Sequence, residues 1–194
     1  MKKQSELKNL VEQTKKREKI KKERVDIKWI ITIVIITFII SFGLSFVANS
    51  TIPNLSLVFG IIITLLFIFI GIIFDIIGVS VTSADEAVFH SMASRKVKGA
   101  STAVKLKKNA DKTSSFCCDV IGDICGVISG AAGTTICAIL VTKYHTDLLL
   151  TGLIITAIIS SLTIGGKAIG KSFAINKSDI ILYEFSKFIS NFYH

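Results

Sequence analysis

Three aspartates interrupt otherwise apolar stretches of this chain, and their type and spacing point to chemistry. Asp75 directly follows the uncharged residues 55–74, whereas Asp119 and Asp123 stand four apart at the start of another apolar stretch. An ionised carboxylate within a bilayer is costly and is kept only where other groups offset its charge. Residues four apart share one face of an α-helix, so Asp119 and Asp123 are expected on the same side. At about 1.5 Å per residue, Asp123 lies on the order of 12 Å inside the membrane if lipid begins near Ser115.

Carboxylate and hydroxyl oxygens are the ligands that hard cations prefer, so these aspartates are candidate ligands for Mg²⁺ or Na⁺. The stretch that ends at Asp75 runs in the opposite direction to the one that contains Asp123, so all three carboxylates reach a similar depth. Hydroxyl groups close by in the sequence belong to Ser80, Thr82, Ser83 and Ser115. A structural alternative remains open for two of the aspartates. Asp119 can cap a helix N-terminus, where carboxylates are stabilised, and Asp75 can reach the lipid headgroups.

Four long stretches without a charge must position these residues. They cover residues 29–48, 55–74, 124–142 and 148–166. Each is long enough to cross a hydrocarbon core of about 30 Å as a helix. Backbone polar groups cannot stay unpaired in lipid, so helices are the expected form. The first stretch is expected to be retained, because 28 residues precede it and it is longer than the apolar core of about 7 to 15 residues in a signal peptide.

The basic residues set the expected orientation. Of the 23 Lys and Arg residues, 11 lie in residues 1–28, 7 in residues 84–114 and 4 from Lys167 onward. These three segments fall on one side of a chain with four spans. The positive-inside rule therefore predicts a multi-pass protein of the cell membrane with both termini in the cytoplasm. The net charge of +9 is interpreted as a basic rim against anionic lipid headgroups rather than as a nucleic-acid surface.

The segments outside the spans are amphipathic. Residues 84–114 predict one or two helices at the membrane surface, broken near Gly99, and residues 178–193 carry one apolar stripe. The sequence thus predicts an all-α polytopic membrane protein with about four transmembrane helices plus amphipathic juxtamembrane helices. The expected segments are a basic cytoplasmic leader (1–28), an added first span (29–48), and a membrane domain (55–194) with spans at about 55–83, 115–142 and 148–166, a cytoplasmic connection (84–114) and an interfacial helix (178–193).

Glycines repeat along the third span. Gly122, Gly126 and Gly130 are four residues apart, a spacing that lets another helix approach closely. They predict a packing face for another helix.

Four short segments, in this order, resemble the membrane domain of the cyclin M and CorC magnesium transporters. Residues 83–92 (SADEAVFHSM) are similar to the signature that closes the first helix of that domain, and the basic segment through 103–106 (AVKL) to its cytoplasmic connection. Residues 120–123 (VIGD) are similar to the apolar pair, Gly and Asn that open its next helix. Residues 166–182 resemble the end of its third helix and the juxtamembrane helix that follows.

The resemblance implies a homodimer whose membrane domain binds a largely dehydrated Mg²⁺ and moves it out of the cytoplasm, with Na⁺ coupling proposed for bacterial members. Glu86 and Asp123 match the acid and the Gly-Asn motif of that family. Asp123 replaces Asn, and Thr163 and Gly166 stand where the family commonly has Glu and Pro. One expected acidic group is therefore missing. The paired nucleotide-binding CBS domains of that family are not found in these 194 residues, so any regulation by cytosolic nucleotide would need a separate regulatory protein.

Two functions remain open. One is transport of Mg²⁺ or Co²⁺ through an acidic site in the inner leaflet. Its predicted metal ligands are Asp123, Asp119, Asp75, Glu86 and Ser83, of which Glu86 also shapes the cytoplasmic entrance. The other is a non-transporting membrane protein that packs with itself or a partner through the glycine face, which the missing acid favours. Enzymatic activity and a covalent cofactor are not expected. Asp75 and Asp123 are similar to the paired aspartates of intramembrane proteases, but the sole proline, Pro53, cannot supply the Pro-Ala-Leu motif of those enzymes.

Overall fold

A computed structural model describes residues 27–51 and 56–192 of the chain. The regular structure of these residues is entirely helical, and four stretches of helix are long and apolar enough to cross a membrane. These stretches are α2 (Ile27–Thr51), α3 (Leu57–Ser83), the continuous run of α6 (Ala110–Ser115), η2 (Phe116–Gly122) and α7 (Asp123–Tyr144), and α8 (Leu148–Asn176). The predicted fold class is therefore confirmed. Of the expected leader, residues 1–26 lie outside the described residues.

Helix α2 is the first candidate span. Contacts divide the chain into two units, Met1–Ile36 and Thr37–His194, and the boundary falls within α2. The helix is apolar around its whole circumference and exposes large side chains such as Ile31 and Phe38. Such a pattern suits a helix whose surroundings are lipid rather than water. The α2 described here occupies residues 27–51, and the predicted first span was 29–48.

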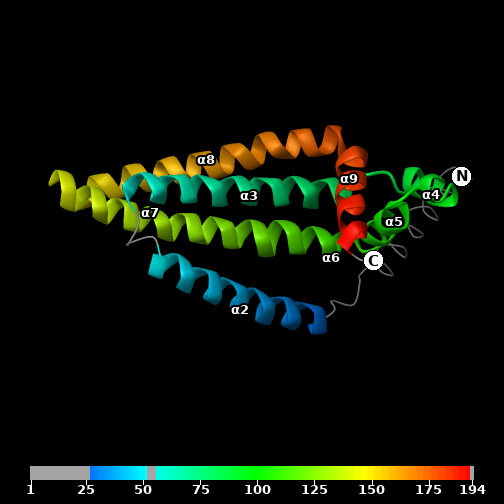
Figure 1. Ribbon diagram of the computed structural model, residues 1–194, viewed down its shortest axis with the longest axis horizontal. Helices are drawn as coiled ribbons and strands as arrows, with labels where there is room; N and C mark the ends of the chain where they lie inside the picture. Colours follow the sequence, from blue (N-terminus) through cyan, green and yellow to red (C-terminus); the bar gives the residue numbers. More distant parts are fainter. Residues whose placement is uncertain (1–26, 52–55, 193–194) are drawn as a thin grey trace, which may run out of the picture. The chain divides into compact units, whose positions relative to one another are not determined.

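Helices α3, α7 and α8 run side by side as a bundle (Figure 1). Small residues allow them to approach closely, as is usual between membrane helices. On α3, a Cβ added to Gly71 would stand 3.1 Å from the Cβ of Cys125, and one added to Gly78 would overlap the Sγ of Cys118. Where α8 meets α3, the side chain of Ile72 fills the space that a Cβ on Gly166 would need.

Of the glycine face predicted on the third span, only the Gly122 end contacts another helix within the described residues. A Cβ on Gly122 would stand 3.7 Å from the carbonyl oxygen of Gly71, which is ordinary contact with α3. A Cβ on Gly126 or Gly130 would meet nothing within 4 Å. Gly133 is the glycine of α7 that packs tightly against α8, where Ile159 lies against it. The face of Gly126 and Gly130 therefore stays open.

Helix α9 (Ser178–Phe192) crosses one end of the bundle, and α4 (Glu86–Ser94) and α5 (Ala100–Lys108) lie beyond it (Figure 1). We call this region the α9 end. A separate small core holds it together. The core consists of Val81, Ala84, Phe89, Ala103 and Leu182, which come from α3, the α3–α4 junction, α4, α5 and α9.

Two polar contacts fasten the α9 end to α3. The Nζ of Lys107 donates to the carbonyl oxygens of Val81 (3.1 Å) and Thr82 (2.7 Å), which pairs carbonyls that the end of a helix leaves open. The backbone N–H of Asp85 donates to Oδ1 of Asp179 at 2.8 Å, which joins the α3–α4 junction to α9. Between α4 and α5 the chain turns at Gly99, whose φ is +86°, a value that glycine adopts without steric cost.

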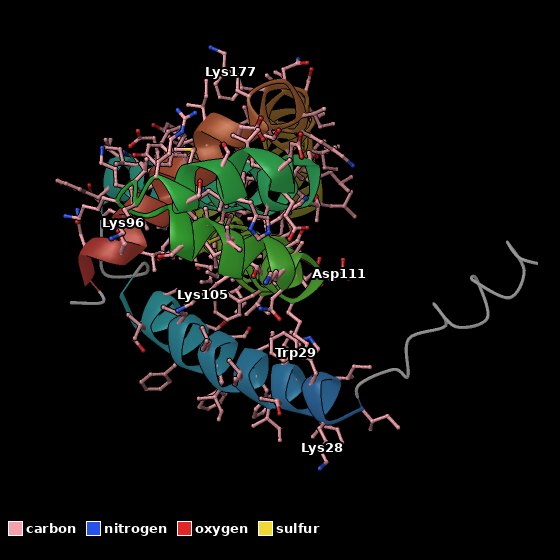
Figure 2. The ribbon with its side chains drawn as sticks, turned by 90° about the vertical axis from the view of Figure 1, so that its right-hand side faces the viewer. Lys28, Trp29, Lys96, Lys105, Asp111 and Lys177 are labelled. Atoms are coloured by element: carbon pink, nitrogen blue, oxygen red, sulfur yellow. The ribbon has the colours of Figure 1, made fainter. Side chains whose placement is uncertain are left out.

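Basic side chains gather at the α9 end. Figure 2 views the bundle from this end and labels Lys96, Lys105 and Lys177 there. The predicted surface segment 84–114 is thus two helices, α4 and α5, followed by the start of the third candidate span at Ala110. The interfacial helix expected at 178–193 is α9, with Leu182 and Ser186 buried and Ile180 exposed.

Close packing at Gly78 yields the first prediction. Gly78→Ala places a methyl group against Cys118, 3.1 Å from the backbone oxygen of Ser114 and 3.2 Å from the Cβ of Cys117. Overpacking of this kind typically costs about 1–3 kcal/mol. We expect a lower thermal unfolding midpoint of the purified protein in detergent.

Gly165→Ala on α8 is the matched control, because the added Cβ would meet nothing within 4 Å. Its midpoint should equal or slightly exceed that of the wild type, since Ala favours a helix over Gly by about 1 kcal/mol. Equal effects of the two substitutions would contradict the described contact between α3 and the third span.

Candidate functional site

One lysine of α8 lies within ion-pair distance of two of the three aspartates. The Nζ of Lys167, on α8, lies 3.2 Å from Oδ1 of Asp123, the first residue of α7, and 3.9 Å from Oδ1 of Asp75 on α3. All three side chains come from candidate membrane spans. Each of the three packed helices therefore contributes one charged group to a single cluster, which we call the Asp–Lys–Asp cluster.

The members of the Asp–Lys–Asp cluster differ in exposure. The side chain of Asp75 is 15% exposed, that of Lys167 is 26% exposed and that of Asp123 is 69% exposed. Asp75 thus forms the inner wall of the cluster, whereas Asp123 faces outward from α7. Asp75 and Lys167 are thus partly buried, and Asp123 is largely exposed. With both carboxylates ionised and the lysine protonated, the cluster carries one net negative charge.

The Lys167 ammonium can lie close to the backbone of the third span because the residue there, Gly122, has no side chain. A Cβ on Gly122 would stand 3.6 Å from the Nζ of Lys167, so the ammonium lies against the backbone of Gly122. Gly71 of α3 faces the same point. The ammonium therefore lies beside Gly122, where the third span contacts α3 at Gly71.

Segment η2 (Phe116–Gly122), directly before Asp123, is a π-helix. A π-helix closes its hydrogen bonds over five residues, so the four-residue spacing that aligns side chains on an α-helix does not hold through it. Asp119 lies inside this segment and is exposed. Among the described residues, no ion pair or hydrogen bond joins Asp119 to Lys167 or to the other two aspartates. The prediction that Asp119 and Asp123 lie on the same face assumed α-helical spacing, which η2 does not have.

A groove leads away from the Asp–Lys–Asp cluster between α7 and α8. It has a volume of about 210 Å³ and is lined by Gly126, Gly130, Thr156, Ile159, Ser160, Thr163 and Ile164. Gly126 is one turn from Asp123, and Thr163 is one turn from Lys167. The hydroxyl of Thr163 donates to the carbonyl of Ile159 at 2.8 Å, so its oxygen keeps lone pairs available as acceptors.

The exposed side of α7 differs from the exposed side of α3. On α3 the exposed residues are large and apolar, for example Phe59, Leu66 and Phe69. After Asp123, the exposed stripe of α7 has one large apolar residue, Val127, and its other members as far as Thr142 are small or carry a hydroxyl group. The exposed residues with small or polar side chains on this stripe are Asp123, Gly130, Thr134, Ala138 and Thr142. Large apolar side chains favour lipid, whereas small and polar ones are typical of surfaces between membrane helices.

The remaining two candidates lie away from the cluster. Ser83 is the last residue of α3 and is about 12 Å along the helix axis from Asp75. Glu86 begins α4, and its Oε1 lies 3.1 Å from the Nε2 of His90. Among the described residues, no group of three or more His, Cys, Asp or Glu side chains could hold a metal ion. The five predicted ligands therefore do not form one coordination shell in this structure.

Sequence reasoning missed Lys167 as a member of the site. The fourth span was expected to end at residue 166, so Lys167 counted as the start of a basic tail. Helix α8 instead continues to Asn176, which leaves Lys167 well inside the helix. A signal was present, because a lysine within a span is costly unless a carboxylate at the same depth offsets it.

The four cysteines of the third span, Cys117, Cys118, Cys125 and Cys137, are free thiols.

Comparisons with protein families, with curated proteins and with solved structures found no match to this chain.

Proposed function

We propose that this chain is a membrane transporter for a divalent cation, Mg²⁺ or Co²⁺, and that Asp75 and Asp123 bind the cation. The observation that carries the proposal is the convergence of two carboxylates, from two different spans, on one cationic group. A pair of carboxylates that already holds an ammonium is a site with the charge and the oxygen ligands that a hard cation needs.

Charge favours a divalent over a monovalent ion. If a divalent cation takes the place of the Lys167 ammonium, it balances the two carboxylates fully, whereas Na⁺ leaves one negative charge. Uncompensated charge within a membrane is unfavourable, so the divalent complex is the better matched of the two. Mg²⁺ usually binds proteins through one or two carboxylates and retains several waters, so two aspartates are a sufficient protein contribution.

The distribution of basic residues supports an orientation with the α9 end in the cytoplasm of the cell. Arg95, Lys96, Lys98, Lys105 and Lys108 all belong to α4, α5 or the turn between them. At the opposite end, the described turn between α7 and α8 adjoins only Lys143. The positive-inside rule puts the richer side in the cytoplasm, with the protein in the plasma membrane and both termini inside. Glu86 and Ser83 then lie near the cytoplasmic mouth.

The test is a flux measurement with the full chain in liposomes. We expect wild-type protein to move Mg²⁺ or Co²⁺, detected by an indicator dye on the far side of the membrane. Asp123→Asn and Asp75→Asn should each lower the flux by about tenfold or more, because each 1.4 kcal/mol of lost cation binding is a factor of ten. The exposed carboxylate of Asp111 lies outside the cluster, so Asp111→Asn is the matched control and should keep the wild-type flux.

Two results would contradict the proposal. One is the absence of flux through the wild type for Mg²⁺, Co²⁺ and Na⁺ alike. The other is an equal loss of flux in Asp111→Asn and Asp123→Asn, which would assign the effect to general surface charge. Flux of Na⁺ alone would keep the transporter and change the ion.

A second function is favoured by the open groove at Gly126 and Gly130. We propose as the alternative a membrane protein that associates with a second copy of itself through this face without transport. Small residues at four-residue spacing suit close approach of a partner helix, and a Cβ at either glycine meets nothing within 4 Å in this chain.

Gly130→Leu tests the alternative. The leucine side chain fills the groove. We therefore expect the apparent affinity of self-association, measured by energy transfer between two labelled copies in liposomes, to fall by about tenfold, which is 1.4 kcal/mol. Gly165→Leu, outside the groove lining, is the matched control and should leave association unchanged. A wild-type protein that stays monomeric at all protein-to-lipid ratios would rule out the alternative.

A further inference from the structure

We propose that Lys167 is a tethered substitute for the cargo cation: its ammonium fills the Asp75–Asp123 site whenever the cargo is absent, and so allows the empty transporter to return. The inference rests on the proposed cation transport and adds how the unloaded half of the cycle becomes possible.

The geometry makes the lysine and the cargo alternatives. A cation held by both carboxylates would have to enter the space around Nζ, which now lies 3.2 Å from Oδ1 of Asp123 and 3.9 Å from Oδ1 of Asp75. The carboxylates would hold it either through its retained waters or after moving closer, because Mg²⁺ binds oxygen at about 2.0–2.1 Å. An ammonium and a divalent ion in contact repel each other, and this repulsion grows as the local dielectric constant falls. Binding of the cargo must therefore move the ammonium out of the site.

The displaced ammonium of Lys167 can move toward water. Lys167 has a long flexible side chain that is 26% exposed, so it is not enclosed by the bundle. Its carbon chain can stay on the apolar surface while the charged end moves toward water, as lysines near membrane boundaries do. One turn further along α8, the exposed Lys171 marks the direction of the α9 end.

The electrostatic states explain why a tethered cation is useful. The two carboxylates with neither ion carry two uncompensated negative charges, with Lys167 they carry one, and with a divalent cargo they carry none. Charge inside a membrane is costly, so the form without any cation is the least able to rearrange. Lys167 lowers that cost in the empty form. Without it, only the loaded form rearranges readily, and the transporter exchanges cations instead of moving them in one direction.

Lys167→Met tests this consequence, since methionine keeps a flexible side chain and removes the charge. In liposomes, net flux of Co²⁺ down a gradient should fall by about tenfold or more relative to wild type, whereas exchange of isotopically labelled Co²⁺ against unlabelled Co²⁺ should stay within about threefold. Lys167→Arg retains the charge and should keep both activities. Lys171→Met is the matched control, because Lys171 is exposed and lies one turn away, and it should also keep both.

Net flux through Lys167→Met at the wild-type level overturns the inference and leaves the proposed transport intact. Loss of exchange together with net flux also overturns it, because the lysine would then be required for the loaded form. If Lys167→Met does not purify as a folded protein, Lys167→Gln is judged by the same two measurements. A wild type with neither net flux nor exchange would instead refute the transport proposal itself.

Discussion

Charges inside a membrane need partners at the same depth, and this requirement connects α3, α7 and α8 of the protein. Lys167, Asp75 and Asp123 come from three different helices, and none of the three is compatible with lipid by itself. Pairing them requires that α8 lie against both α3 and α7. The glycines at positions 71 and 166 supply the close approach that this arrangement needs. Packing and charge therefore specify the same arrangement of helices.

The polar contacts at the α9 end act on the same helices. Lys107 holds the final carbonyls of α3, and Asp179 holds the α3–α4 junction to α9, which follows directly after α8. The hydroxyl of Ser80 also lies 3.5 Å from the carbonyl oxygen of Ala174, across α3 and α8. The ends of α3 and α8 are thus tied together near the basic surface, whereas the groove side of α7 and α8 is open at Gly126 and Gly130.

Much of the fold could be predicted from the sequence, because the length of an apolar stretch is a strong signal in membrane proteins. Four long uncharged stretches identified the spans, and the break at Gly99 separated α4 from α5. The candidate site was harder. Asp75 and Asp123 were identified because a carboxylate is costly in lipid, and both belong to the cluster. Lys167 was missed because the uncharged stretch ends at residue 166, whereas α8 continues for ten more residues, to Asn176. A lysine inside the helix was therefore interpreted as the start of a basic tail.

The relation of Asp119 to Asp123 depends on a local irregularity that the sequence pattern does not reveal. Segment η2 departs from α-helical spacing between these two residues. The open glycines also depend on which side of α7 faces the other helices, and the four-residue spacing alone does not settle that. In both cases the residue types were informative, whereas the direction in which they point came from the packing of three helices together.

The central claim is that a carboxylate and an ammonium interact inside the bundle, and a double-mutant cycle on Asp75 and Lys167 tests it most directly. The free energy of unfolding is measured in mixed micelles for wild type, Asp75→Asn, Lys167→Met and the double variant. The account predicts an interaction energy of about 1–3 kcal/mol between the two side chains. Additive effects, with no interaction energy beyond error, would contradict it.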